Sequence, residues 1–290
     1  MENLKTGSPI AQKMHRRKKW IPQDLGKHIY MWIVLILMLM PLYILLISSV
    51  KTSAQVLNDF FVPTFPFVFS NFPKAWEIIS PYFTTTFYYA VLNTVLTTLV
   101  AVLAGYAFGK LRFPGRKLLF MLLFAKMFLP TVMNLVPSFM LASKLGILNT
   151  AWVIVLFCIG QSQPYWVFVM KTFVEQQPKE LFESMRLDGA SEFRIFTTLV
   201  TPLLLPMISL MAINLVLFSW NDFVWPLVTL TEDSKRTITV GLYWLSKSQV
   251  GRDYGVLMSG YLLSALPLVV VFMFGMKAFM KGLTAGAIKI

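Results

Sequence analysis

Long apolar runs, separated by short polar segments, make up most of the chain. Six of these runs reach the roughly 20 residues that a helix needs to cross the hydrocarbon core of a membrane. They cover residues 29–50, 85–109, 118–140, 151–172, 199–226 and 255–280. The pattern predicts an all-α membrane protein with six transmembrane helices. Many secondary transporters carry two related halves in one chain, and these spans show no such repeat, which favours half of a pore that works with a partner.

Positive charge is distributed unevenly between the two sides of the predicted membrane. The 26 Lys and Arg outnumber the 13 Asp and Glu. Eighteen of the 26 fall in segments on the amino-terminal side and seven on the other, with Lys126 inside a span. Because cytoplasmic loops carry the excess of Lys and Arg, both termini are expected in the cytoplasm. Topology thus accounts for most of the charge, and we expect no nucleic-acid partner. The stretch HRRKKW in the basic segment 1–28 is expected to lie on anionic membrane lipid, with a regulatory role as the alternative.

Signals of catalysis and of metal binding are absent from the sequence. Cys158 is the only cysteine and lies in an apolar run, so we expect a buried side chain and neither a disulfide nor a zinc site. His15 and His28 lie outside the spans, and no pair of carboxylates is placed for acid–base chemistry. Gly105 and Gly109 lack the spacing of a phosphate loop and have the small-xxx-small spacing of packed transmembrane helices. We expect a chain that is not an enzyme, holds no cofactor or metal, and takes its energy from another protein or an ion.

A few polar side chains inside the spans are candidates for ion coupling or for a substrate pathway. Lys126 is the candidate for ion coupling, or it is close enough to the cytoplasmic end of its span for its ammonium to reach the interface. Gln161 and Gln163 lie in the fourth span beside Pro164, which frees a backbone carbonyl. Amide side chains inside a membrane span either form hydrogen bonds to a neighbouring helix or line a water-filled pathway. We assign Gln163 to the pathway with both possibilities open.

A second polar group stands at the outer end of the fifth span. Trp220, Asn221 and Asp222 follow some twenty mostly apolar residues of that span. They form either an interfacial aromatic anchor or a polar rim where a hydroxyl-rich solute enters. We assign all three to the substrate pathway on the second interpretation.

The segment 174–198, between the fourth and fifth spans, is longer than a simple connector. Pro178 is suited to the first position of a short amphipathic helix, and Gly189 to its end, since glycine adopts the left-handed conformation without strain. Ala190 has a small side chain that allows a tight turn, and Ser191 is a good N-cap for the next helix. This fixed shape indicates either a docking element for another protein or an amphipathic linker on the membrane surface.

The same segment resembles the EAA loop of ABC-transporter permeases. The matching positions are Glu183, Asp188, Gly189, Ala190, Ile195, Pro202 and Pro206. Ser184 and Met185 depart from the two small residues that follow the glutamate in the family pattern. Three further stretches, LRFPGRKLLF, WNDFVWPL and GLTAGAIK, are similar to the carbohydrate-importer branch, and most of all to the smaller, MalG-like permease subunit of maltose-type systems.

The resemblance implies a type I ABC importer permease fold in the cell membrane, with a permease domain over 29–281 and a cytoplasmic tail over 282–290. In that family the loop is a coupling helix that fits a groove on an ATP-binding subunit. The implied partners are a second, non-identical permease subunit, two ATP-binding subunits that hold ATP and Mg, and an extracytoplasmic solute-binding protein that delivers a sugar or oligosaccharide. The residues expected to couple to the ATPase are Glu183, Arg186, Asp188, Gly189 and Ala190. A homodimeric secondary carrier or channel and a membrane scaffold without transport are the alternatives.

Overall fold

The structure, a computed structural model, describes residues 22–287, with side chains described for residues 25–250 and 252–275. Most of the basic segment 1–28 and the end of the tail 282–290 therefore lie outside the described residues. The described chain is built of helices without strands, which confirms the all-α fold class. It divides into a short unit that ends at residue 44 and a large unit that begins at residue 45.

The short unit is the first part of α1 (Pro22–Ser49). Its exposed side chains are mostly apolar, and they include Met31, Trp32, Leu37 and Met38. A long helix that is apolar on every side is typical of a membrane span. The first predicted span is therefore present as a helix, and it begins before residue 29.

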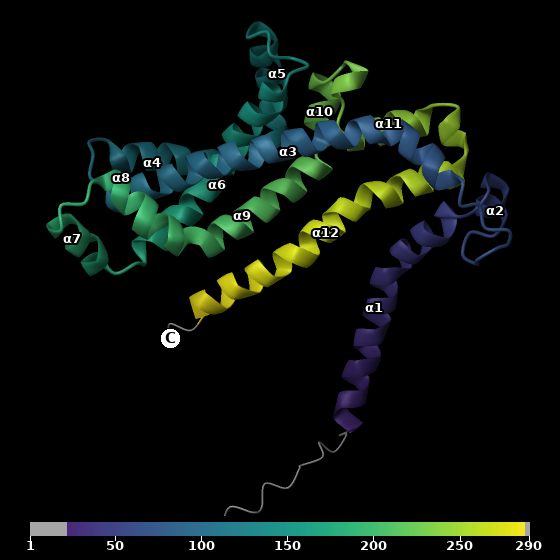
Figure 1. Cartoon of the computed structure of the whole chain (residues 1–290), viewed down its shortest axis with the longest axis horizontal. Helices are drawn as coiled ribbons and strands as arrows, with labels where there is room; N and C mark the ends of the chain where they lie inside the picture. The colour runs from purple at the N-terminus through teal and green to yellow at the C-terminus, as the bar shows by residue number, and fades with distance from the viewer. Residues whose placement is uncertain (1–21, 288–290) are drawn as a thin grey trace, which may run out of the picture. The chain divides into compact units, whose positions relative to one another are not determined.

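Long helices packed side by side form the large unit (Figure 1). They are α3 (Asn71–Lys110), α6 (Ala151–Glu175), α9 (Thr201–Asn221) and α12 (Tyr254–Ala287). α3 contacts each of the other three and forms the centre of the unit. The predicted second, fourth and sixth spans correspond to α3, α6 and α12, although α3 begins well before residue 85.

Two glycines allow α3 and α6 to approach closely. A Cβ atom on Gly105 would stand 2.4 Å from the Cβ of Met170, and one on Gly109 would stand 2.9 Å from Val174 Cγ1. Both distances are shorter than van der Waals contact between carbon atoms. The helix-packing role predicted from the spacing of these glycines is confirmed.

A chain of buried polar side chains joins α3 to α6 and α9. The amide nitrogen of Asn93 donates to Ser219 Oγ at 2.6 Å and to Cys158 Sγ at 3.0 Å. Thr97 donates to Asn93 Oδ1 at 3.0 Å, and Gln163 Nε2 donates to the carbonyl of Thr97 at 2.9 Å. Such interhelical bonds stabilise helix association in lipid, where water does not compete for them. Cys158 is buried, as predicted.

The third span is broken, and the prediction of one continuous helix over 118–140 is wrong. Two helical pieces, Arg116–Phe128 and Thr131–Lys144, meet at an angle of 104°. Their regular parts are α4 (Arg116–Ala125) and α5 (Leu135–Lys144), with 3₁₀ turns between them. Leu129 has extended backbone angles because Pro130 disfavours the helical conformation of the residue before it. The described residues thus hold five helices long and apolar enough to span a membrane, or six if the bent pair is one span.

The fifth span also ends earlier than predicted. α9 stops at Asn221 rather than at residue 226, because Asp222 is extended, with φ −64° and ψ 127°. Short elements follow before α12: α10 (Val224–Thr229), α11 (Ile238–Lys247) and single 3₁₀ turns at Asp233–Lys235 and Val250–Arg252. Another short helix, α2 (Ser53–Asn58), follows α1.

Candidate functional site

The EAA-type loop, residues 174–198, folds as two short helices joined by a tight turn. α7 covers Lys179–Leu187 and α8 covers Glu192–Ile195, and a π-helical turn over Phe196–Val200 continues α8 into α9. The π-helical turn makes the loop continuous with the fifth span, as Figure 1 shows. Pro178 occupies the cap position of α7, whose first helical residue is Lys179, and not the first helical position that was predicted for it.

The turn between α7 and α8 has the hydrogen bonds of a Schellman motif. Gly189 has φ +75° and donates its N–H to the carbonyl of Arg186 at 3.0 Å. The N–H of Ala190 reaches the carbonyl of Met185 at 2.9 Å. Ser191 Oγ then accepts a backbone N–H from the first turn of α8 at 3.3 Å. The predicted roles of Gly189 as a helix stop and of Ser191 as a cap are confirmed.

A polar triad fixes the two short helices to the membrane helices. Arg186 Nε donates to Glu192 Oε1 at 2.9 Å, and the hydroxyl of Tyr106, on α3, donates to the other oxygen of the same carboxylate. The hydrogen bond to Glu192 raises the pKa of Arg186 above its ordinary value, so the guanidinium remains charged. Arg186, assigned from the sequence to a partner contact, thus already has a partner within the loop. Neither Glu192 nor Tyr106 was found from the sequence, since the bond between them joins segments 86 residues apart.

Apolar contacts hold the inner face of α7 against the helix ends. Phe182 is 2% exposed, and the ammonium of Lys110 lies 4.3 Å from the centre of its ring. Lys110 also donates to the carbonyl of Gln177 at 3.0 Å. Ile195 is fully buried in the core formed by α3, α6 and α9. The position of the loop is therefore determined by packing and not only by its own helices.

The outer face of the loop is exposed and carries large apolar side chains. Leu187 is 88% exposed and Phe193 76% exposed, with Leu181 close to them in sequence. Glu183 and Asp188 are exposed on the same short segment. Large exposed apolar side chains in a short segment that also carries exposed charges are typical of protein interaction surfaces.

The residues assigned to the substrate pathway do not converge on one cavity. Gln163 is 7% exposed and bonds to α3, so it fulfils the helix-bonding alternative. The indole of Trp220 donates to the carbonyl of Ser264 on α12 at 3.0 Å. Asn221 is exposed and donates to a carbonyl of its own helix, and Asp222 ends that helix. Their assignment to the pathway stays a prediction.

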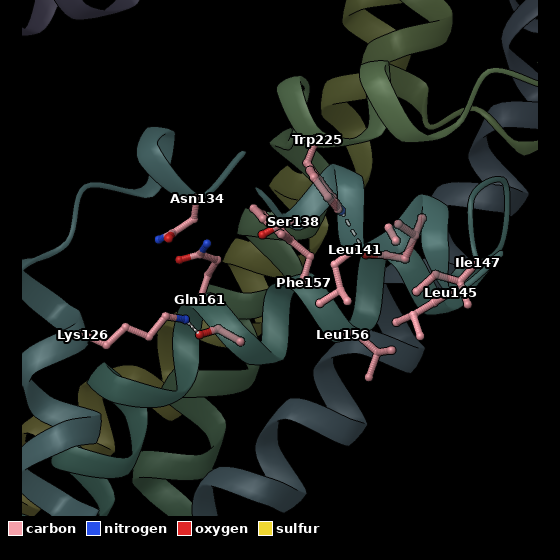
Figure 2. Close-up of a pocket in the computed structure, with 13 residues that line it drawn as sticks. Lys126, Asn134, Ser138, Leu141, Leu145, Ile147, Leu156, Phe157, Gln161 and Trp225 are labelled. Carbon is pink, nitrogen blue, oxygen red and sulfur yellow. Dashed lines mark hydrogen bonds between the residues drawn. The ribbon is translucent and has the colours of Figure 1, made fainter. Parts of the chain in front are cut away.

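A separate cavity of about 230 Å³ lies between the broken third span, α6 and α10 (Figure 2). Its polar lining comes from Lys126, Asn134, Ser138 and Gln161. The apolar lining includes Leu141, Leu156, Phe157 and Trp225. Sequence analysis singled out Lys126 and Gln161 in this lining but not Asn134 or Ser138, because the bend at Pro130 that brings them to the cavity was not predicted.

Lys126 meets a backbone carbonyl that the α6 helix leaves free. Pro164 has no N–H, so the carbonyl of Gly160, four residues earlier, has no helical partner. The ammonium of Lys126 donates to that carbonyl, as the dashed line in Figure 2 shows. The freed carbonyl was expected from the sequence, whereas its donor was not.

Comparison with known proteins identifies the family. Residues 101–285 match the family model of the binding-protein-dependent transport system inner membrane component. The chain is 33% identical over 261 residues to the arabinooligosaccharides transport system permease protein AraQ of Bacillus subtilis, covering 88% of this chain and 92% of that protein. It is also 26% identical over 281 residues to the probable ABC transporter permease protein YurM of Bacillus subtilis, covering 97% and 93% of the two chains.

The fold is shared with a solved importer. A chain of a bacterial ABC transporter involved in the import of the acidic polysaccharide alginate superposes with a TM-score of 0.78 at 20% identity, covering 90% of this chain and 99% of that one. A second structure of an alginate transporter, in complex with a periplasmic protein bound to an alginate pentasaccharide, gives a TM-score of 0.66 at 16% identity, covering 87% and 93%. With the family model matched from α3 to α12, the chain belongs to the family of binding-protein-dependent transport system inner membrane components.

Proposed function

We propose that this chain is one of two non-identical permease subunits of an ABC importer that carries a sugar or oligosaccharide across the cell membrane. The observation that carries the proposal is the family match over residues 101–285, which includes the whole EAA-type loop. Relatives named for arabinooligosaccharides, galactooligosaccharides and maltodextrin support a carbohydrate substrate. The alginate importers of similar fold support delivery by an extracytoplasmic binding protein.

In this proposal the EAA-type loop docks on one of two ATP-binding subunits, which hold ATP and Mg. The exposed Leu187 and Phe193 supply apolar contact, and Glu183 and Asp188 supply polar contact around them. Gly189 and Ala190 give the turn its shape. Because α8 continues into α9, a movement of the docked loop is transmitted directly to a membrane helix.

The charge pattern supports an orientation with both termini in the cytoplasm. The loop carries Lys and Arg on the same side as residues 1–28, which is the arrangement that the positive-inside rule assigns to the cytoplasm. This orientation places the EAA-type loop where ATP-binding subunits are found and the segment between α9 and α12 toward the binding protein. The basic amino-terminal segment then faces anionic lipid.

The docking proposal is tested by replacing Gly189 with valine. A β-branched residue at φ +75° is strained, and we expect Gly189→Val to abolish ATP-dependent uptake and to lower co-purification with the ATP-binding subunits, while the chain stays in the membrane. Gly146→Val is the matched control, since Gly146 has φ +66° in a turn between α5 and α6, away from the loop. We expect this variant to retain co-purification. Full uptake by Gly189→Val would refute docking through this turn.

A further inference from the structure

We infer that the cavity between the broken third span and α6 is a sugar-binding subsite, in which Lys126 and Asn134 donate hydrogen bonds to oxygen atoms of one sugar ring. The inference rests on the proposed function and assigns to this subunit a direct contact with the substrate. It differs from the pathway predicted from the sequence, since none of Gln163, Trp220, Asn221 and Asp222 lines this cavity.

The first observation is the state of Lys126. Its ammonium bonds to a neutral carbonyl, that of Gly160, and the ion pairs found among the described residues do not include it. An ammonium has three N–H donors, so the bond to Gly160 leaves donors for a ligand. A cation inside a membrane span is costly, and such residues mark substrate or ion pathways.

The second observation is a buried donor without a partner. The amide nitrogen of Asn134 is enclosed but has no hydrogen-bond partner among the described residues. Buried donors in proteins are almost always paired. Asn134 also lines the cavity, so rotation of its side chain turns the unpaired amide toward a ligand there. Figure 2 shows Asn134 on the side of the cavity where Gln161 and Lys126 also lie. The polar end of the cavity therefore offers donors from three elements.

The third observation is the apolar end of the same cavity. Phe157 and Trp225 stack with their ring centres 3.9 Å apart, and the indole of Trp225 is held by a hydrogen bond to the carbonyl of Val153 at 2.9 Å. A sugar ring has an apolar C–H face and a rim of hydroxyl oxygens, which match an aromatic wall and a set of donors. The volume of about 230 Å³ is below the roughly 300–1,000 Å³ of pockets for drug-sized molecules. One ring of a saccharide, rather than a whole oligosaccharide, is the expected occupant.

Cysteine labelling in the reconstituted importer, with its partner subunits and binding protein, tests whether sugar enters the cavity. In a Cys158→Ala background, Ser138→Cys places the thiol in the cavity, and Ser143→Cys places it at the end of α5, at an exposed position outside the cavity lining. We expect a water-soluble thiol reagent to modify Ser138→Cys during turnover and added saccharide to slow that reaction several-fold. The rate at Ser143→Cys should not depend on saccharide. An equal rate at Ser138→Cys with and without saccharide would overturn the inference.

Substitution of Lys126 distinguishes the kind of oxygen that the site binds. Lys126→Met removes the donor, and loss of one charge-assisted hydrogen bond corresponds to a decrease of about tenfold to a hundredfold in kcat/KM of uptake. If the acceptor is a hydroxyl group of a neutral sugar, Lys126→Gln restores most of the uptake. If it is the carboxylate of an acidic sugar, Lys126→Gln is as defective as Lys126→Met.

A purely structural role of Lys126 gives a different result. If Lys126 served only to pair the Gly160 carbonyl, its substitution would lower uptake but leave the saccharide protection of Ser138→Cys unchanged, and that outcome would overturn the inference. Saccharide uptake by wild-type vesicles, measured in parallel, distinguishes failure of the subsite from failure of the importer function. Saccharide uptake by the wild type without protection at Ser138→Cys rejects only the subsite, whereas no uptake of any delivered saccharide by the wild type rejects the importer and the subsite together.

Discussion

The approach of α3 to α6 at Gly105 gives the sharpest stability prediction. In Gly105→Ala the new Cβ would stand 2.4 Å from Met170 Cβ and 3.1 Å from the backbone nitrogen of Lys171. Neither atom is the free end of a side chain, so the helices must separate by about 1 Å to reach an ordinary carbon contact of about 3.5 Å. Overpacking costs about 1–3 kcal/mol, and a 2.4 Å approach to atoms fixed to the backbone puts this substitution in the upper half of that range, about 2–3 kcal/mol. The helix preference of alanine over glycine returns about 1 kcal/mol. The net destabilisation is about 1–2 kcal/mol.

The assay is thermal unfolding of the purified subunit in detergent. For a chain of this size, 1 kcal/mol corresponds to about 2–4 °C in Tm, so Gly105→Ala should lower Tm by about 2–8 °C. Gly109→Ala should cost less, because the new Cβ would stand 2.9 Å from its nearest atom, Val174 Cγ1, rather than 2.4 Å. Gly26→Ala is the matched control, since a Cβ there meets no atom within 4 Å. A Tm for Gly105→Ala equal to that of Gly26→Ala would refute the role of the close approach.

Two further substitutions test contacts that hold the loop and the end of α1. Tyr106→Phe removes the hydroxyl that donates to Glu192. Because that carboxylate is about half exposed, we expect the free energy of unfolding to fall by only about 1 kcal/mol, but the ratio of sugar uptake to ATP hydrolysis to fall as well. The control Tyr88→Phe, at a 56% exposed position, should leave the ratio unchanged. In Gly255→Ala the new Cβ would stand 2.0 Å from the carbonyl oxygen of Lys51, so the yield of monodisperse protein should fall sharply; normal yield and Tm would contradict this packing.

The spans and the EAA-type loop were predictable because their signals are local. Hydropathy reports the apolar content of each span, and in lipid a helix is the structure that satisfies its own backbone. The turn of the loop follows from Gly189 and Ser191, whose preferences for the left-handed conformation and for the cap position do not depend on the rest of the fold. The packing of Gly105 and Gly109 was likewise visible in their spacing.

The cavity was not predictable for the opposite reason. Hydropathy is the same for a straight and a bent span, so it does not predict the 104° bend at Leu129–Pro130. Pro130 is a local signal of the bend, since a proline disfavours the helical conformation of the residue before it. The pairing of Tyr106 with Glu192 and of Lys126 with Gly160 joins residues far apart in the sequence. Contacts of this kind depend on how the helices pack, which a single sequence does not specify residue by residue.

The choice of lysine at position 126 is the strongest argument that the cavity has a function. Hydroxyl groups commonly satisfy carbonyls within the same helix: in α6 itself, Ser162 donates to the carbonyl of Cys158 at 2.7 Å. The Gly160 carbonyl is met instead from another helix and by a charged group, and a charge costs about 2.5–3.5 kcal/mol at the centre of a membrane helix. An ammonium carries three N–H donors and the carbonyl takes one of them, so Lys126 brings more donors than the carbonyl uses. Binding of an oxygen-rich ligand next to the unpaired amide of Asn134 supplies a reason for that excess.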